Sequence, residues 1–91
     1  MKTLTPQSPI KDYFVYIVKC SDETLYTGIA TDLTRRVDEH NYSDKGAKYT
    51  KTRRPVELLY SEKLQDRSSA SKREYEIKKL TREKKLELIN A

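Results

Sequence analysis

The sequence predicts an α+β fold: a three-stranded antiparallel sheet flanked by helices, in the order β-β-α-β-α-α. Two segments near the N-terminus are rich in β-branched and aromatic residues, and only three polar residues separate them. A third segment alternates like a strand, and the remaining stretches repeat apolar residues at helical spacing. A chain of 91 residues allows a single domain. We place it at residues 12–91 and expect residues 1–11, which hold two of the three prolines, to form a flexible tail.

The first two strands are expected to form a hairpin. Residues 13–20 (YFVYIVKC) are almost continuously apolar, as in a central strand covered on both faces, and residues 24–30 (TLYTGIA) form the next strand. A polar turn at residues 21–23 pairs Cys20 with Thr24 and so fixes the antiparallel register. This register places three residues on one face of the sheet: Tyr16, Tyr26 and Gly28.

The first helix is expected directly after the hairpin. Thr31 can cap a helix over residues 32–41, with Asp32 near its positive N-terminal end. Residues 42–53 then form a polar, basic loop in which Gly46 permits a turn. Two pairs of residues lie one turn apart on neighbouring faces of the helix: the apolar Leu33 and Val37, and the polar Arg36 and His40.

A third strand and two more helices follow the basic loop. The strand covers residues 56–61 (VELLYS), and Asp66 is a suitable N-cap for a helix over residues 67–79. In the strand, Val56, Leu58 and Tyr60 alternate with Glu57 and Leu59. The buried stripe of the helix is marked by Ala70, Ile77 and Leu80. Glu74 falls on the same stripe, which is informative because an unpaired carboxylate facing a core is costly. After Thr81, a short last helix packs two residues inward: Leu86 and Ile89.

The charge balance indicates a partner that carries phosphate. The net charge is +5 and the isoelectric point is about 9.3, and residues 45–55 include five basic residues and no acidic one. A solvated surface without a partner is the alternative for this segment. The expected nucleic-acid contacts are Lys45, Lys48, Tyr49, Lys51, Arg53 and Arg54, with Tyr49 stacking on a base.

The remaining composition excludes several kinds of site. Cys20 is the only cysteine and His40 the only histidine, so neither a disulfide within the chain nor a Cys-rich or His-pair metal site can form. No apolar run approaches the roughly 20 residues of a membrane-spanning helix, and the N-terminus lacks the apolar stretch of a signal peptide. A soluble, cytoplasmic protein is therefore expected.

The hairpin carries a recognisable pair of motifs. Phe14-Val15-Tyr16 is followed by Tyr26-Thr27-Gly28, Arg36 lies ten residues after Tyr26, and His40 and Glu74 come later. Together these residues resemble the pattern of the GIY-YIG nuclease superfamily, in its small, stand-alone, single-domain branch. The likeness covers about residues 13–90. The chain departs from the pattern in that Phe-Val-Tyr stands for Gly-Ile-Tyr, and Tyr-Thr-Gly for Tyr-Ile-Gly.

The resemblance implies a metal-dependent endonuclease that hydrolyses phosphodiester bonds in DNA, of the kind used in DNA repair. It would nick one strand and prefer a structure rather than a sequence. The implied catalytic residues are Tyr16, Tyr26, Arg36, His40 and Glu74. In this set Glu74 binds Mg²⁺ or Mn²⁺, Arg36 grips phosphate with its donor fork, and His40 relays a proton. Either tyrosine can be the one that activates water.

Two other functions fit the same residues. The domain can be a nucleic-acid-binding module that retains the GIY-YIG fold without turnover, or a protein-interaction domain in which these side chains are structural. Glu74 would then pair with a basic residue of the loop, and His40 would interact with the dipole at a helix C-terminus. The oligomeric state and the choice between DNA and RNA stay open.

Overall fold

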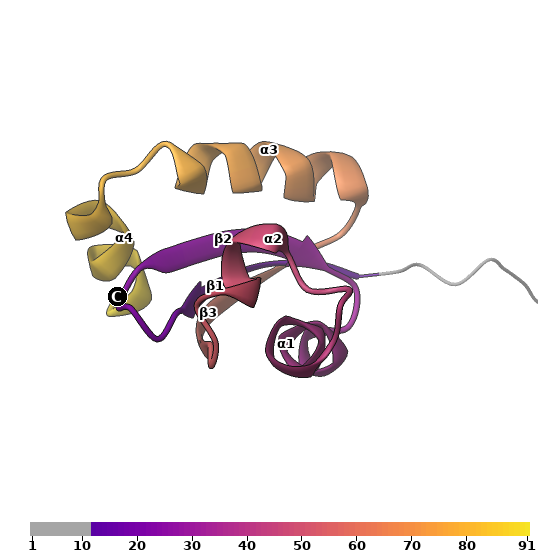
Figure 1. Ribbon diagram of the computed structural model, residues 1–91. Coiled ribbons are helices and arrows are strands. Elements are labelled where there is room, and N and C mark those ends of the chain that lie inside the picture. The colour runs from indigo at the N-terminus through magenta and orange to yellow at the C-terminus, as the bar shows by residue number, and fades with distance from the viewer. Residues whose placement is uncertain (1–11) are drawn as a thin grey trace, which may run out of the picture.

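The computed structural model describes residues 12–91, so the tail expected at residues 1–11 lies outside the described part. Three antiparallel strands form one sheet in the order β2-β1-β3, with helices on both faces (Figure 1). The elements are β1 (Tyr13–Lys19), β2 (Leu25–Ala30), α1 (Leu33–Tyr42), α2 (Lys48–Lys51), β3 (Glu57–Leu64), α3 (Arg67–Lys78) and α4 (Arg82–Ile89). The predicted α+β class is confirmed, and the order of elements differs only by the added short helix α2.

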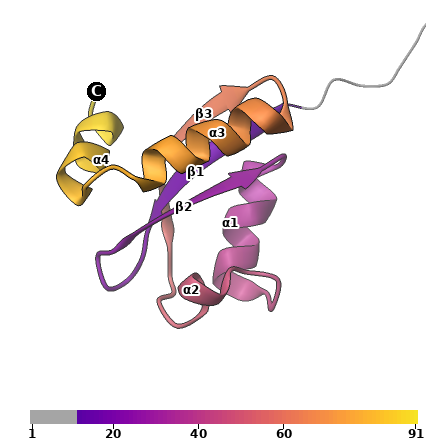
Figure 2. The ribbon, with the colours of Figure 1, turned by 90° about the horizontal axis from the view of Figure 1, so that it is seen from above.

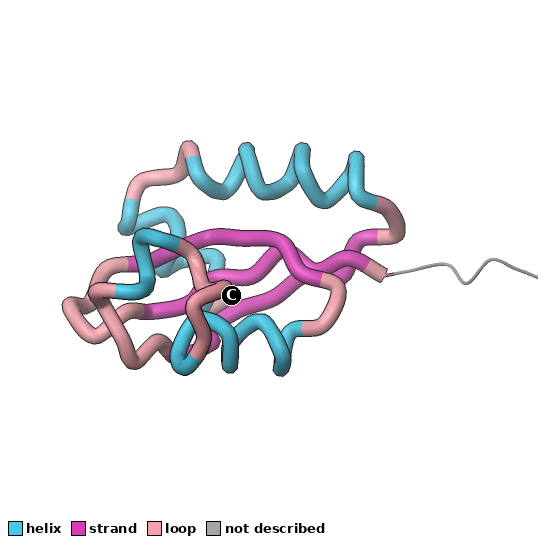
Figure 3. The backbone as a smooth tube through the Cα atoms, turned by 45° about the vertical axis from the view of Figure 1, so that its right-hand side comes forward, coloured by secondary structure: helices cyan, strands magenta, loops and turns pink. Residues whose placement is uncertain are grey.

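The sheet separates two layers of helices. α3 lies over one face and α1 over the other, and β2 forms the edge of the sheet between them (Figures 1 and 2). The tube in Figure 3 shows the same sandwich from another side. The core on the α3 side contains Val15, Ile17, Ala70 and Ile77, with Leu88 and Ile89 of α4 packed against it. The core on the α1 side contains Tyr16, Val18, Cys20 and Val56. Each face of β1 is therefore covered, as the continuous apolar run predicts.

The register of the hairpin agrees with the expectation from the sequence. Tyr16 pairs with Gly28 and Val18 with Tyr26, so Tyr16, Tyr26 and Gly28 share the face that α1 covers. Glu23 in the turn adopts a positive φ of 71°, which gives the three-residue turn its left-handed step. Within residues 12–91, no helix is long and apolar enough to cross a membrane.

The third strand differs from the expectation in length and in face. It extends to Leu64, and its pairing with β1 shifts between Tyr60 and Leu58, which oppose Ile17 and Val18. This bulge leaves Leu59 as an extra residue and exchanges the faces on either side of it. Val56 consequently packs on the α1 side and Tyr60 on the α3 side, so the predicted common face for Val56, Leu58 and Tyr60 is wrong.

The helix ends follow the expected capping chemistry, with one correction. Asp66 accepts a hydrogen bond from the Ser69 backbone N–H, and Thr81 caps α4 in the same way. For α1 the capping side chain is Asp32, which accepts from the Arg35 backbone N–H, and not Thr31. An ionised carboxylate at this position also interacts favourably with the positive end of the helix.

The basic loop contains regular structure and a buried glycine, which the expectation of a polar loop did not include. It contains α2, and Gly46 is buried against the C-terminal turn of α1. A Cβ on Gly46 would lie 2.7 Å from the carbonyl oxygen of Glu39 and 3.0 Å from the Cα of His40. Its φ is not positive. Glycine is thus required here for close backbone approach, which brings α2 against His40, and not for the turn that the sequence suggested.

Candidate active site

Tyr16 lies at the centre of the sheet, and its ring extends over the neighbouring strand. A Cβ on Gly28 would lie 2.5 Å from the Tyr16 hydroxyl oxygen and 2.7 Å from its Cζ. The absence of a side chain at Gly28 therefore lets the Tyr16 ring cross over β2 toward the edge of the sheet. Tyr16 is 1% exposed, so this position is also fixed by close packing.

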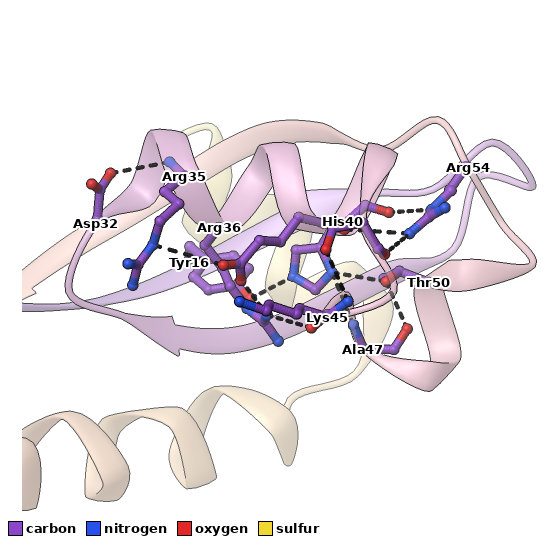
Figure 4. A network of polar contacts seen from close by, with 11 residues as sticks. Tyr16, Asp32, Arg35, Arg36, His40, Lys45, Ala47, Thr50 and Arg54 are labelled. Carbon is purple, nitrogen blue, oxygen red and sulfur yellow. Dashed lines mark hydrogen bonds and ion pairs between the residues drawn. The ribbon is translucent and has the colours of Figure 1, made fainter.

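His40, on α1, contacts the Tyr16 hydroxyl from the helical layer that covers this face of the sheet. It lies in the last turn of α1 and is completely buried. Its Nε2 is 2.6 Å from the Tyr16 hydroxyl oxygen, and its Nδ1 is 2.8 Å from Oγ1 of Thr50 in α2 (Figure 4). A buried chain of polar groups thus connects β1, α1 and α2.

The pKa values of this pair are displaced in opposite directions. Burial, followed by the positive charge of Arg36, lowers the pKa of His40 from 6.5 to about 4. Burial raises the pKa of Tyr16 to about 12, although the Arg36 guanidinium beside its hydroxyl opposes that rise. At neutral pH both groups are uncharged, and Nε2 of His40 can accept the Tyr16 proton. Burial therefore outweighs the helix dipole, which alone would favour a protonated histidine at this end.

The pKa of His40 predicts a loss of stability in mild acid. A histidine whose pKa falls from 6.5 in the unfolded chain to about 4 in the fold takes up its proton preferentially when unfolded. Its contribution is complete above pH 6.5 and is lost as the pH falls toward 4, at a cost of about 3 kcal/mol. We expect this loss in the free energy of unfolding measured by urea denaturation between pH 7 and pH 4.

The matched control is a His40→Gln variant, which keeps all carboxylates and removes only the titrating ring. The pH dependence of wild type minus that of the variant isolates the histidine. Parallel curves for the two proteins would show that His40 titrates near its ordinary pKa in the fold.

Arg36 lies beside the buried Tyr16–His40 pair and is held in place by hydrogen bonds. Its Nη1 donates to Oε1 of Glu39 at 2.8 Å and to the backbone carbonyl of Lys45 at 2.9 Å (Figure 4). Its side chain keeps 26% of its surface exposed. An anchored but accessible guanidinium can bind a phosphate oxygen without losing much conformational freedom.

Tyr26 belongs to the same cluster through its ring. Its centroid is 5.4 Å from that of His40 in an edge-to-face contact and 5.9 Å from that of Tyr49 in a stacked contact. The Arg53 guanidinium lies 3.9 Å from the Tyr49 ring centroid. Tyr49 is therefore engaged by two side chains and remains 37% exposed, so its stacking on a base stays a prediction.

Glu74 lies on α3, in the helical layer on the other face of the sheet. It lies on the face of α3 that carries Ala70 and Ile77, and α3 packs on β2 and β1. Its negative charge contributes to the raised pKa of Tyr16, so the two groups interact electrostatically. Its Oε2 is 3.1 Å from Nζ of Lys78, one turn along the same helix. The sequence alternative, a pair with a residue of the basic loop, does not form.

The donor set suits a hard divalent cation held mainly by its substrate. Within residues 12–91, no three His, Cys, Asp or Glu side chains gather into a ligand cluster. Glu74 would then be a single carboxylate ligand, and Lys78, half exposed, forms only a surface pair that a cation can displace. Mg²⁺ commonly binds one or two carboxylates and completes its shell with water and phosphate oxygens. The residues therefore fit Mg²⁺ or Mn²⁺ and not a structural zinc site.

The basic residues of the loop divide into two groups. Lys45, Lys48 and Lys51 are exposed and have no ion pair within the described part of the chain. Arg53 donates to Asp22, and Arg54 is turned inward, where it donates to the backbone carbonyls of the last turn of α1 (Figure 4). Arg54 thus caps a helix C-terminus and does not present its guanidinium to a partner.

Sequence reasoning missed three contributors to this region. Glu39 holds Arg36 and could have been found from its i,i+3 spacing. Thr50 contacts His40, but nothing in the loop sequence signals a buried hydroxyl. A cleft beside Arg36 is lined by two further arginines, Arg35 of α1 and Arg67 of α3, which are far apart in sequence. This cleft lies at the end of β2, between the two helical layers.

The fold and this constellation define a class of protein. Residues 12–87 match the model of the GIY-YIG catalytic domain. The chain therefore belongs to the GIY-YIG family, a family of nucleases.

Within that family the chain is similar to UPF0213 proteins. UPF0213 protein DP2720 of Desulfotalea psychrophila is 56% identical over 86 residues, which cover 94% of this chain and 78% of that protein. A UPF0213 protein of Staphylococcus aureus is 62% identical over 77 residues, covering 85% and 93%. The solution structure of UPF0213 protein BH0048 from Bacillus halodurans aligns with a TM-score of 0.56 at 42% identity, covering 87% of this chain and 83% of that one. The solution structure of EF2693 from E. faecalis aligns with a TM-score of 0.58 at 40% identity, covering 86% and 83%.

Proposed function

We propose that this protein is a divalent-metal-dependent endonuclease that hydrolyses phosphodiester bonds in DNA and nicks one strand by structure rather than by sequence. The observation that carries the proposal is the buried hydrogen bond between Tyr16 and a neutral His40, with Arg36 beside it. Glu74 lies on α3, which packs on the edge strand β2. A base, a phosphate ligand and a metal ligand are the groups that phosphodiester hydrolysis needs.

Tyr16 is the general base in this mechanism. The Tyr16 oxygen takes a proton from the attacking water while its own hydroxyl proton passes to Nε2 of His40, 2.6 Å away. No free phenolate is required, so the raised pKa of Tyr16 does not oppose this step. The lowered pKa of His40 does oppose it, and the negative charge of a bound phosphate would offset this by favouring the imidazolium. Its burial keeps bulk water out of this path, and the attacking water enters with the substrate. Tyr26, which contacts His40 only through its ring, orients the imidazole.

Arg36 and Glu74 act on the phosphate. The Arg36 fork binds non-bridging oxygens and stabilises the charge that develops on them. Glu74 would hold Mg²⁺ or Mn²⁺, which would supply Lewis-acid polarisation of the scissile phosphate when bound. Since α1 and α3 cover opposite faces, these two residues can contact one phosphate only beyond the edge strand β2.

The flanking DNA backbone extends along this edge in both directions. At the α2 end, the exposed Lys45, Lys48 and Lys51 offer phosphate contacts. At the other end, the cleft with Arg35 and Arg67 offers a second set. Contacts of this kind carry little sequence information. A preference for branched or frayed DNA is therefore a matter of shape.

The exposed lysines of the basic loop predict a specific change in the salt dependence of DNA binding. Replacing Lys48 and Lys51 together by alanine removes about two phosphate contacts, so the slope of log Kd against log salt concentration should fall by about 2. Binding of a catalytically inactive protein to duplex DNA, measured by fluorescence anisotropy over a salt series, gives this slope. The control replaces Lys72 and Lys84, which are exposed on α3 and α4, and should leave the slope unchanged. Equal slopes for both double variants would remove α2 from the binding surface.

One assay separates the candidate functions. Purified protein is incubated with labelled branched, single-stranded and duplex DNA and with RNA, in Mg²⁺, in Mn²⁺ or in chelator. We expect nicking of branched DNA that requires the divalent ion. Salt-sensitive binding without product under any condition would instead identify a non-catalytic nucleic-acid-binding module. The absence of both binding and product would identify a protein-interaction domain.

A further inference from the structure

Thr50 forms the inner end of the polar chain that begins at Tyr16. It is completely buried in α2, on the side of His40 away from Tyr16. Its hydroxyl donates to the backbone carbonyl of Ala47 at 3.0 Å, and the same oxygen lies 2.8 Å from Nδ1 of His40 (Figure 4). A threonine hydroxyl has one proton. Because that proton is directed to Ala47, the oxygen is free to accept a hydrogen bond from an Nδ1–H group of His40.

The hydrogen bonds at the Tyr16 end of this polar chain also favour a proton on Nδ1 of His40. The Tyr16 hydroxyl has a donor beside it, the Arg36 guanidinium, so its own proton is best directed to Nε2 of His40. A neutral imidazole carries one N–H. With the proton on Nδ1, every group from the Tyr16 hydroxyl to the Ala47 carbonyl has a partner, and only the long contact from the Ala47 backbone N–H, 3.5 Å from Nδ1, is given up. With the proton on Nε2, the buried Tyr16 proton would have no acceptor within the described residues.

A competing donor makes the role of Thr50 testable. The backbone N–H of Ala47 lies 3.5 Å from Nδ1 of His40. It is too far to compete well with the Thr50 oxygen, but it can donate to a bare Nδ1. Loss of the Thr50 hydroxyl would therefore favour the tautomer with the proton on Nε2. In that tautomer, Nε2 donates to Tyr16 and cannot accept its proton.

We propose that Thr50 is a positioning residue that holds His40 in the Nδ1–H tautomer, so that Nε2 stays available to accept the Tyr16 proton. The catalytic consequence rests on the proposed nuclease function, whereas the tautomer does not. A side chain from the basic loop thus determines the direction of proton transfer within the Tyr16–His40 pair, whose members lie on β1 and α1.

The tautomer can be measured directly, because His40 is the only histidine. Nitrogen NMR of tag-free protein with ¹⁵N-labelled histidine distinguishes the protonated ring nitrogen from the bare one at neutral pH. We expect Nδ1–H in the wild type and in Thr50→Ser, which keeps a hydroxyl, and mainly Nε2–H in the near-isosteric Thr50→Val. An Nε2–H wild type, which is read without any variant, would overturn the proposal. An Nδ1–H tautomer in folded Thr50→Val would overturn it as well.

Cleavage kinetics supply the second readout. Thr50→Val should lower kcat at least tenfold with little change in KM, and Thr50→Ser should restore most of the rate. A switched tautomer with an unchanged kcat would overturn the positioning role. Lack of cleavage by wild-type protein that shows the expected tautomers would instead overturn the proposed nuclease function and leave the assignment of the tautomer intact.

Discussion

Replacement of Glu74 by glutamine is expected to abolish divalent-dependent cleavage, with a loss of at least about 10³-fold in the single-turnover rate. Glutamine keeps the size and shape of the side chain but replaces one carboxylate oxygen by an amide NH2 group and removes the charge that would hold a cation. Among the described residues Glu74 belongs to no group of three or more His, Cys, Asp or Glu side chains that could hold the ion without it. Stability should change little, since the partly exposed i,i+4 pair with Lys78 contributes roughly 0.3–0.5 kcal/mol. Quenched-flow or gel assays of labelled branched DNA, with parallel urea denaturation, measure both quantities.

Glu76→Gln is the matched control on the same helix. Glu76 is two residues away, half exposed, and paired with Arg73 at 3.2 Å, so the substitution removes an equal charge on a face turned away from β2. Its cleavage rate should remain within about twofold of wild type. Equal losses in the two variants would show that general charge, and not a cation at Glu74, supports the reaction.

Replacement of Tyr16 by phenylalanine should lower the cleavage rate by about 10²–10⁴-fold, the range typical for loss of a general base. The ring still fills the space over Gly28, so DNA binding should survive. The buried Nε2 of His40 loses its hydrogen-bond partner, which costs about 1–3 kcal/mol in the free energy of unfolding. Single-turnover cleavage, anisotropy titration and urea denaturation distinguish these three effects.

Tyr26→Phe is the comparison that separates the two tyrosines. Its ring contacts with His40 and Tyr49 remain, and no hydrogen bond from its hydroxyl occurs within residues 12–91. The rate should fall much less than in Tyr16→Phe. The reverse ranking would move the role of general base to Tyr26, where the sequence alone left the choice open.

Local chemistry in the sequence was sufficient for most of the scaffold. The short polar turn fixed the register that places Tyr16 opposite Gly28, and Asp66 and Thr81 begin helices because they satisfy free backbone N–H groups. The continuous apolar run in β1 indicated a strand covered on both faces. Each of these features depends on neighbours only a few residues apart along the chain.

Features that depend on packing between residues far apart in the chain could not be predicted from the sequence. The bulge at Leu59 arises from pairing with β1, and it exchanges faces that strict alternation would keep. His40 is neutral because residues from β1 and α2 bury it, although its place at a helix end favours a charge. Arg54 appeared to be a surface cation and instead caps α1 from 14 residues away. The separation of Glu74 and Arg36 onto opposite faces of the sheet likewise follows from topology.

The central claim is that Glu74, from the α3 layer, and the Tyr16–His40 pair, from the α1 side, serve one site across the edge strand. Paramagnetic broadening of amide NMR signals by Mn²⁺, in the presence of a non-cleavable phosphorothioate oligonucleotide, tests it most directly. We expect broadening centred on Glu74, Tyr26 and Gly28, and its loss in Glu74→Gln. Broadening centred elsewhere, such as the exposed turn at Asp22 and Glu23, or broadening that survives in Glu74→Gln, would contradict the account.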